Sequence, residues 1–472
     1  MVAVAQGSLT GRAKLEAVTN LMNQLKEDLK SSKLNPHRRD ALLEELKVYG
    51  RDPVNSDPIF TREGIEILTR YAFDSSSNTT CRNALRVLCN AMFLRPATRQ
   101  MFVDLGYEAQ ACDKLKNDNR DDEFLVSRLL FLTTYDTTIN LGDLIDQHHV
   151  AGIIVQNLAR HAKRLSFGAQ GHKVERVEPM EDMALAETLK LLFNVTHFTP
   201  DRVNAFTPAV PHIITILTQH ELPAPHTPPL APPLGPAANA LINLKLDDEE
   251  AQSSLFPDSE PSSVAGRVLY LLDKSLASYS DDELEANCTP LITLIMTIHE
   301  HAPDEVRSFI RQKLLPTEED RKQILGRGNS LTSRLLRNST NAMTPKLREA
   351  ISHLLFDLSD KDASRFVLNV GYGYASGFLF QNNIPVPESA SEAPSSTAGG
   401  SERPVNPITG QFVDEEKEVE MPEMSQEEKE REAERLFVLF ERLRATGVMD
   451  VQNPVTKAYQ AGRIQELDSD EE

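Results

Sequence analysis

The sequence repeats one short apolar phrase six times, and each copy ends on a small polar residue. The copies are Leu85-Arg-Val-Leu-Cys-Asn90, Leu129-Leu-Phe-Leu-Thr133, Leu189-Lys-Leu-Leu-Phe-Asn194, Ala240-Leu-Ile-Asn243, Leu291-Ile-Thr-Leu-Ile-Met-Thr297 and Leu354-Leu-Phe-Asp357. Their closing residues lie 43, 61, 49, 54 and 60 positions apart. Repeats of about 33–47 residues are typical of stacked pairs or triplets of helices, and loops lengthen them. The spacing therefore predicts an α-solenoid.

Composition agrees with stacked helices. Apolar residues make up 40% of the chain and aromatic residues 6%, and Trp is absent. Such a Leu-rich chain suits helices better than a β-sandwich. We expect an all-α superhelix of stacked helices over residues 1–384. Its concave groove would hold a partner rather than carry out covalent chemistry.

Charge and cysteine usage narrow the partners and the compartment. The net charge is −20, which argues against nucleic acid and anionic membranes, because both attract basic surfaces. The four cysteines form no C-x-x-C pair, and Cys81 and Cys89 lie about two turns apart on one predicted helix. We expect buried, reduced thiols. Because we find neither a signal peptide nor a long apolar run, we expect a cytoplasmic protein without a membrane span.

Beyond residue 384 the composition changes. Residues 385–424 are rich in Pro, Ser and Glu, which predicts a flexible linker. Residues 425–447 combine a capping box, an apolar stripe and a final glycine, which together predict one amphipathic helix. An isolated helix of this kind is marginal in water, so we expect it to dock on the solenoid. Residues 448–472 form an acidic tail.

The sequence contains no catalytic constellation that we can assemble. It lacks a Walker motif, a nucleophile elbow and a zinc-protease motif, and neighbouring histidines such as His148 and His149 point to different helix faces. Gly371-Tyr-Gly-Tyr-Ala-Ser-Gly377 suggests a dinucleotide loop, but its glycine spacing is one residue too long. A loop that needs a positive φ is the alternative. We therefore expect no enzyme, no cofactor and no metal.

The residues that close the phrases are the first candidate contacts. In stacked helices the last helix of each repeat lines the concave wall, where Asn can bond a ligand backbone and Arg can grip a carboxylate. The candidates are Arg82, Arg86, Asn90, Arg128, Asn194 and Asn243. Two alternatives stay open: each Asn could tie down a neighbouring turn, and each Arg could be a solvated surface charge.

Two other features concern partners. The segment 222–236 holds seven prolines, which disfavours a helix and favours extended polyproline geometry. It would suit an SH3-type domain if the chain were a scaffold. Ser389 and Ser469 each stand three positions before an acidic residue, the pattern that acidophilic casein-type kinases favour. Phosphate at either serine would add about −1.5 to −2 charges that a basic patch could bind.

Segments spread over nearly the whole chain resemble the synembryn family, the cytosolic exchange factors and folding chaperones of heterotrimeric G-protein α subunits. In chain order the matching segments are Arg82–Asn90, Leu129–Thr133, Leu189–Thr196, Leu331–Leu335, Ser364–Gly373, Asn406–Gly410, the helix over 425–446 and Val451–Pro454. The linker departs from the family pattern, because it lacks the dense Ser/Thr/Asp run that is phosphorylated in some relatives.

The resemblance implies an armadillo/HEAT superhelix that binds a G-protein α subunit (Gα) in its nucleotide-free or GDP-bound form. In the family the concave groove receives the C-terminal helix of Gα, and the C-terminal segment contacts the nucleotide-binding half. We expect a monomer that its partner recruits to the cell cortex. The alternative from another class is an armadillo scaffold that binds linear peptides without any effect on GDP release.

Overall fold

The structure is a computed structural model, and the chain divides into two units, residues 1–415 and 416–472. The described residues are 9–169, 179–224, 226–385, 395–396, 403–406, 408–416 and 431. Apart from Arg431, the predicted amphipathic helix and the acidic tail lie outside these residues. Ser389 and Ser469 lie outside them too.

Twenty α-helices make up most of the regular structure that the described residues adopt. In chain order they are α1 (Gly11–Ser31), α2 (Pro36–Tyr49), α3 (Arg62–Phe73), α4 (Asn78–Leu94), α5 (Ala97–Val103), α6 (Glu108–Leu115), α7 (Arg120–Thr133), α8 (Leu141–Asp146), α9 (Val150–Ala169), α10 (Pro179–Phe198), α11 (Val210–Gln219), α12 (Leu234–Ile242), α13 (Glu249–Leu255), α14 (Ser263–Ser278), α15 (Asp281–His301), α16 (Asp304–Leu314), α17 (Leu331–Asn338), α18 (Pro345–Leu358), α19 (Ala363–Val370) and α20 (Tyr372–Gln381). The 3₁₀ helices are η1 (Asp57–Phe60), η2 (Pro200–Ala209), η3 (Asp320–Lys322) and η4 (Val413–Glu415). Strands β1 (Ser395–Ser396) and β2 (Pro404–Val405) pair antiparallel.

Side chains just before the helices supply the acceptors that start them. The hydroxyl of Ser77 accepts a hydrogen bond from the N–H of Thr80 in α4, at 3.3 Å. Asn119 plays the same part for α7, and a reciprocal capping box formed by Ser280 and Glu283 starts α15. Acidic residues in the first turns of α7 and α15 add a favourable interaction with the helix dipoles. Local sequence therefore fixes where these helices begin.

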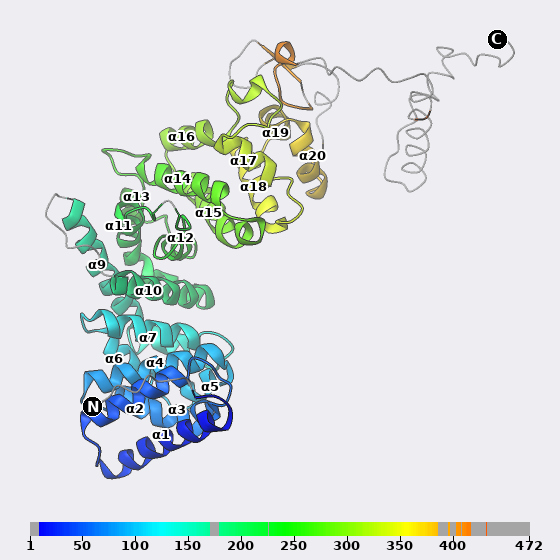
Figure 1. Cartoon of the computed structure of the whole chain (residues 1–472). Coiled ribbons are helices and arrows are strands. Elements are labelled where there is room, and N and C mark those ends of the chain that lie inside the picture. The colour runs from blue at the N-terminus through cyan, green and yellow to red at the C-terminus, as the bar shows by residue number, and fades with distance from the viewer. Residues whose placement is uncertain are drawn as a thin grey trace, which may run out of the picture. The chain divides into compact units, whose positions relative to one another are not determined.

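The six repeat phrases lie in six helices that contact one another in chain order. Helix α4 packs on α7, α7 on α10, α10 on α12, α12 on α15 and α15 on α18. Figure 1 shows these helices in succession. A second succession runs alongside, in which α9 packs on α11, α11 on α14 and α14 on α17. Contacts that are mainly between neighbours are the organisation of a solenoid, so the predicted all-α solenoid is confirmed.

The leucines of the phrases form the core that the helices share. Leu85, Leu88, Leu129, Leu189 and Leu354 are fully buried. Burial of one such side chain contributes about 1.5–3 kcal/mol relative to its exposed state. Because these leucines belong to different repeats and to one continuous cluster, their burial holds the repeats together.

The proline-rich segment is turned rather than extended. Hydrogen-bonded turns end at Thr227 and Ala231, and α12 begins within the segment at Leu234 and includes Pro236. Leu230 is buried, and its N–H donates to the hydroxyl of Tyr279 at 3.1 Å. The prediction of polyproline geometry without a helix over 222–236 is therefore wrong in the described part of the segment. The reason is that the leucines between the prolines anchor in the core, which bends the chain.

Residues 403–406 and 408–415 form an ordered segment that we call the strap. They lie within the predicted flexible linker, and the structure differs from that prediction here. Phe412 is buried, and its N–H donates to the carbonyl of Arg321 at 2.9 Å. A few buried side chains, among them Val405 and Phe412, and main-chain bonds to the repeats hold a segment whose average composition is polar. Most of the remaining linker lies outside the described residues.

Gly371 joins α19 to α20 with a φ of +83°. The alternative of a loop that needs a positive φ therefore holds at Gly371 only, because Tyr372–Gly377 form the start of α20 and not a loop. The apolar residues Phe366–Val370 that precede it are helical, as part of α19. A Cβ at Gly371 would come within 3.0 Å of the carbonyl oxygen of Ile408 in the strap. The glycine thus serves a close approach of two backbone segments rather than a nucleotide.

Candidate partner-binding surface

Arg82 on α4 is bound within the fold. Its Nε and Nη2 donate to the two carboxylate oxygens of Asp122 on α7, at 2.9 and 3.3 Å. The Asp122 side chain is only 3% exposed, and it also accepts from Asn117 at 3.1 Å. A forked guanidinium–carboxylate pair of this kind fixes the two helices to each other. Arg82 therefore has the contacts of a structural residue.

Arg86, one turn further along α4, is more accessible. Its Nη2 donates to Asp121 at 2.7 Å and its Nη1 to Asn83 at 3.1 Å. The side chains of Arg86 and Asp121 are 31% and 34% exposed. Solvent screens such a pair, so it contributes little and exchanges readily for another carboxylate. Arg86 remains available to a partner.

The third acidic residue in this turn of α7 points to other helices. Glu123 is buried and contacts the Nε2 of His161 on α9 at 3.0 Å, and it accepts from the hydroxyl of Thr188 on α10 at 2.8 Å. Burial alone would raise the pKa of Glu123, but the bonds from His161 and Thr188 and the nearby positive charge lower it. Asp121, Asp122 and Glu123, which we call the acidic triplet, thereby join α7 to α4, α9 and α10.

The asparagines at the ends of the phrases bond mainly to neighbouring helices. Asn194 is buried, and its amide donates to the hydroxyl of Thr134 at 2.7 Å. Asn243 donates to the carbonyl of Phe193 at 3.0 Å. Both have the contacts of the structural alternative, in which Asn ties down a neighbouring turn. Asn90 is half-buried in the last turn of α4.

Arg128 lines a hollow of about 330 Å³ at the junction of α4, α5, α7 and α10, which we call the α4–α7 hollow. Its guanidinium lies over the ring of Phe124, 5.5 Å from the centroid. Arg99 lies over Tyr135 at 5.8 Å in the same way. Among the lining residues, Phe93 is 62% exposed and Tyr135 is 38% exposed. The complete lining is Phe93, Arg99, Arg128, Phe131, Leu132, Tyr135, Glu187 and Lys190.

Among the lining residues that sequence reasoning did not predict are Phe93, Arg99 and Tyr135. They follow the phrases instead of belonging to them: Phe93 is three residues after the first closing residue, and Tyr135 is two residues after the second. The signal was an aromatic residue just beyond a phrase, and it recurs at the end of α10. There Phe193 stacks on His197 at 6.0 Å, and His197 meets Phe198 edge-on at 5.1 Å.

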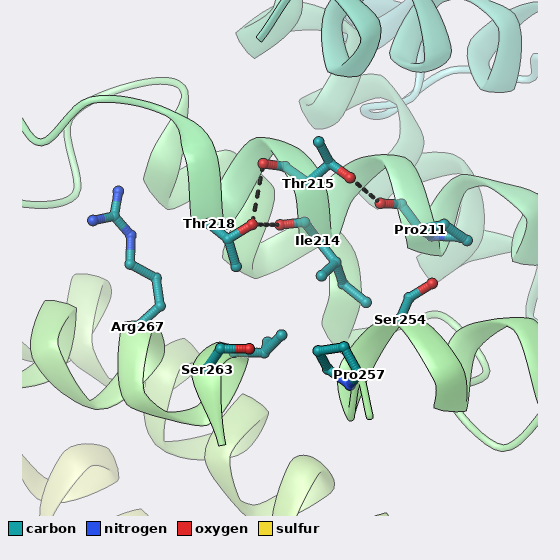
Figure 2. Close-up of a pocket in the computed structure, with 9 residues that line it drawn as sticks. Pro211, Ile214, Thr215, Thr218, Ser254, Pro257, Ser263 and Arg267 are labelled. Carbon is teal, nitrogen blue, oxygen red and sulfur yellow. Dashed lines mark hydrogen bonds between the residues drawn. The ribbon is translucent and has the colours of Figure 1, made fainter. Parts of the chain in front are cut away.

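A second hollow, of about 610 Å³, lies between α11, α13 and α14 (Figure 2). Its threonine hydroxyls donate to carbonyls of their own helix, Thr215 to Pro211 and Thr218 to Ile214. Arg267 donates to the last carbonyls of α11, at Leu217 (3.0 Å) and His220 (2.6 Å). The polar groups of this hollow are therefore used to tie α11 to α14.

A third hollow, of about 860 Å³, is more polar and lies where α14, α15, α17 and α20 meet. Here too the side chains serve the fold. Arg334 pairs with Asp273 on α14, and Arg337 donates to the carbonyls of Gly326 and Gly328. The α4–α7 hollow differs from both in combining exposed aromatic rings with two guanidinium groups.

All four cysteines are buried and free, and burial raises the pKa of Cys89 and Cys288 to about 12. Over the described ranges, no three His, Cys, Asp or Glu side chains gather as a metal site would need. The described helices include none that is both long and apolar enough to cross a membrane.

A family model described as guanine nucleotide exchange factor synembryn matches residues 42–463. The chain belongs to the synembryn family. A synembryn-like chaperone of Schizosaccharomyces pombe is 29% identical over 366 residues, which cover 74% of this chain and 66% of that protein. The chaperone Ric-8A of Danio rerio is 26% identical over 461 residues, which cover 87% of this chain and 81% of that one. The Gallus gallus chaperone Ric-8A is 26% identical over 466 residues, with 89% and 84% covered.

Membership of the synembryn family confirms the resemblance read from the sequence. The family match includes all six repeat phrases and the strap. It therefore covers the α4–α7 hollow and the arginines around it. Among the six predicted contacts, the structure places Arg128 in that hollow and leaves Arg86 accessible at the junction of α4 and α7. Their role in binding stays a prediction.

Proposed function

We propose that this protein is a guanine nucleotide exchange factor and folding chaperone for Gα, and that it makes and breaks no covalent bond. Its membership of the synembryn family and the names of its relatives, which are chaperones, support this proposal. The observation that carries it is the α4–α7 hollow, which differs from the two other hollows above in combining exposed aromatic rings with the guanidinium groups of Arg99 and Arg128.

The hollow fits the end of an amphipathic helix that finishes in a carboxylate. Phe93 and Tyr135 offer apolar walls for side chains of such a helix. Arg99 and Arg128 lie over aromatic rings, which orients their remaining N–H groups toward a carboxylate. Arg86 adds a cation whose own partner, Asp121, is 34% exposed. This combination suits the C-terminal helix of Gα, which the family captures.

Exchange follows from differential binding. If the protein binds nucleotide-free Gα more tightly than GDP-bound Gα, linkage requires that the affinity of Gα for GDP falls by the same factor. A thousandfold fall needs about 4 kcal/mol of differential binding. An interface of more than about 1,000 Å² can supply that difference. The lever would be the captured helix of Gα, drawn away from its own sheet so that the guanine pocket loosens.

The same grip accounts for assistance in folding. A client without nucleotide exposes apolar surface that would otherwise aggregate. Aromatic walls such as those of Phe93 and Tyr135 can cover part of that surface until GTP binds and the client closes. We further expect a cytoplasmic monomer that Gα brings to the cell cortex. An acidophilic kinase that modifies Ser389 or Ser469 also stays a prediction.

The decisive experiment measures GDP release from purified Gα with and without this protein. We expect faster release, and a tighter complex with empty Gα than with GDP-bound Gα. Reversal of charge at Arg86 and Arg128 together (R86E/R128E) should weaken the complex and slow release. The thermal unfolding of this variant should stay nearly unchanged, because exposed ion pairs contribute about 0–1 kcal/mol to stability. Reversal of Arg12 and Arg70, two exposed arginines on α1 and α3, is the matched control.

Two outcomes would overturn the proposal. If the protein binds Gα without any change in GDP release, the alternative holds, and the chain is an armadillo scaffold for linear peptides. The proline-rich segment forms turns in its described part, so it does not show the extended geometry that an SH3-type domain would bind. If R86E/R128E loses helicity, these arginines are structural, and the α4–α7 hollow is not the site of contact.

A further inference from the structure

The strap is seated on the loop between α16 and α17 and on the start of α20. The N–H of Leu325 in that loop donates to the carbonyl of Thr409 at 3.2 Å. The N–H of Gly373 in α20 donates to the carbonyl of Ile408, also at 3.2 Å. Gly410 has a φ of +66°, and a Cβ there would lie 2.3 Å from Cδ1 of Leu325. The strap is therefore docked along its length and closely against this loop.

Arg321, in η3 of the α16–α17 loop, joins the strap to α19. It donates from Nη1 to the carbonyl of Gly410 at 2.9 Å, and from Nη2 to the carbonyls of Leu368 and Asn369 at 3.1 and 2.9 Å. Burial lowers the pKa of Arg321 to about 10, and the charge of the neighbouring Asp320 opposes that fall. The guanidinium thus stays charged at neutral pH. The place of η3 decides whether the strap keeps its seat.

Asp320, the first residue of η3, is held by two hydroxyl residues. Its Oδ2 accepts from the hydroxyl of Thr317 at 2.8 Å and from the N–H of Thr317 at 3.0 Å. Its own N–H donates back to that hydroxyl at 3.3 Å. Its Oδ1 accepts from the hydroxyl of Ser330, the residue that caps α17, at 2.6 Å. Because Thr317 is exposed, this small network is open to an enzyme from the side of Thr317.

The sequence Thr317-Glu-Glu-Asp320 places an acidic residue at each of the three positions after the threonine. An acid at the third position is the pattern already seen at Ser389 and Ser469, which acidophilic kinases favour. Among the serines and threonines of the described ranges, only Ser280 is also followed by three acids. The described chain therefore offers two strong candidates for such a kinase.

The structure separates these two candidates. Ser280 starts α15, where its side chain and its backbone N–H form the capping box with Glu283, and the acids after it belong to the first helical turn. Thr317 instead lies in the loop that follows α16, and both Glu318 and Glu319 are exposed. A kinase binds its substrate as a segment lifted off the protein, and a loop opens at a lower free energy than a packed helix does. Thr317 is thus the more accessible substrate.

We propose that Thr317 is a phosphorylation site for an acidophilic kinase, and that phosphorylation there releases the strap. The kinase transfers the γ-phosphoryl group of ATP to Oγ1 of Thr317, the hydroxyl proton passes to a base of the kinase, and ADP leaves. This switch goes beyond the proposed function and involves no client.

The phosphate acts on η3 in two ways that have the same result. It removes the O–H that donates to Asp320, and it places about −1.5 to −2 charges within hydrogen-bond distance of that carboxylate. Repulsion then moves Asp320 away from Thr317 and Ser330. The same charge attracts Arg321, whose guanidinium would leave the carbonyl of Gly410 to pair with the phosphate. Both movements take the strap off its seat.

The site is tested by phosphorylation of the full chain in a Ser389→Ala/Ser469→Ala background. The protein is incubated with a casein-type kinase, Mg²⁺ and ATP, and the phosphate is located by peptide mass spectrometry. We expect phosphate at Thr317, lost in Thr317→Val and retained in Thr317→Ser. Absence of phosphate at Thr317, or incorporation at Ser280 that equals it, would overturn the assignment of the site.

Release of the strap is tested by hydrogen exchange in the phosphorylated full chain. The amides of Leu325, Gly373 and Phe412 should exchange about ten- to a hundredfold faster than in the unmodified chain, the factor that loss of one or two hydrogen bonds to a charged group gives. Amides in α4, α7 and α10 should keep their protection, which shows that the repeats remain folded. Unchanged exchange at the three strap-contacting amides would overturn the switch.

The role of charge is tested with Thr317→Glu and its neutral match, Thr317→Gln. Both lose the hydroxyl, so only the added charge differs, and Glu should quicken exchange at Phe412 by about fivefold more than Gln. In an Asp320→Asn background this difference should shrink, because the carboxylate that the charge repels is gone. An equal difference in both backgrounds would overturn the mechanism. None of these measurements uses Gα, so they stand apart from the test of the proposed function.

Discussion

The ion pair between α4 and α7 provides a sharp test of which arginine is structural. Arg82→Gln removes the guanidinium from Asp122, whose side chain is nearly fully buried. Removal of one partner of a buried pair costs about 3–5 kcal/mol, because the remaining charge is left desolvated. Asp122 would keep Asn117 at 3.1 Å and the Nζ of Lys114 at 3.9 Å. We therefore expect a loss of about 2–3 kcal/mol, at or below the lower end of that range.

Arg86→Gln is the matched comparison, because it removes the same group from the same helix. Its pair with Asp121 is about one-third exposed on both sides, so we expect a loss below about 1 kcal/mol. Urea unfolding followed by circular dichroism at 222 nm gives the two midpoints. In the Arg82→Gln background, Asp122→Asn should cost about 2 kcal/mol less stability than it does in the wild type. The reason is that it then leaves no buried charge without its partner.

Three results would refute this reasoning. Equal shifts of the urea midpoint for Arg82→Gln and Arg86→Gln would mean that burial does not decide the strength of these pairs. Additive losses for Arg82→Gln and Asp122→Asn would mean that the two groups do not interact. A weakened Gα complex for Arg82→Gln, with an unchanged midpoint, would make Arg82 a contact residue after all.

Three other outcomes can be checked with the same protein. Leu129→Ala, in the core, should cost about 2–5 kcal/mol of unfolding free energy, whereas Phe93→Ala should leave stability intact and weaken Gα binding. Cys89 and Cys288 should resist iodoacetamide at pH 7.5 until the chain unfolds, because their thiols are buried with pKa values near 12. Burial, followed by the arginines of α16, lowers the pKa of His299 in the folded state. The unfolded state then binds more protons, so stability should fall as pH drops below about 6.5, and His299→Gln should flatten that fall in urea midpoints at pH 7.5 and 5.5.

The helices could be predicted from sequence because their causes are local. Leucine spacing and capping residues such as Ser77 and Asn119 lie within a few positions of the helices they specify. The sequence could not separate Arg82 from Arg86, which occupy the same helix one turn apart. Their partners lie 40 and 35 positions away, so only the packing of α4 on α7 decides which pair is buried.

The strap was missed for a different reason. A linker is recognised from average composition, and residues 385–424 are polar on average. The docked state depends on a few residues, above all Gly410, Phe412 and the distant Arg321. None of these stands out in a count of residue types. The α4–α7 hollow likewise needs side chains from four helices, which a reading of single phrases does not bring together.

The acidic triplet has a consequence for how the repeat array responds to force. Stacked repeats often come apart one after another, since each touches only its neighbours. Here three consecutive carboxylates reach α4, α9 and α10 from a single turn, and the bonds of Asp122 and Glu123 are buried, so separating these helices breaks several polar bonds at once. When the molecule is stretched from its ends in an optical trap, α4, α7, α9 and α10 should then unfold in one step, rather than one repeat after another.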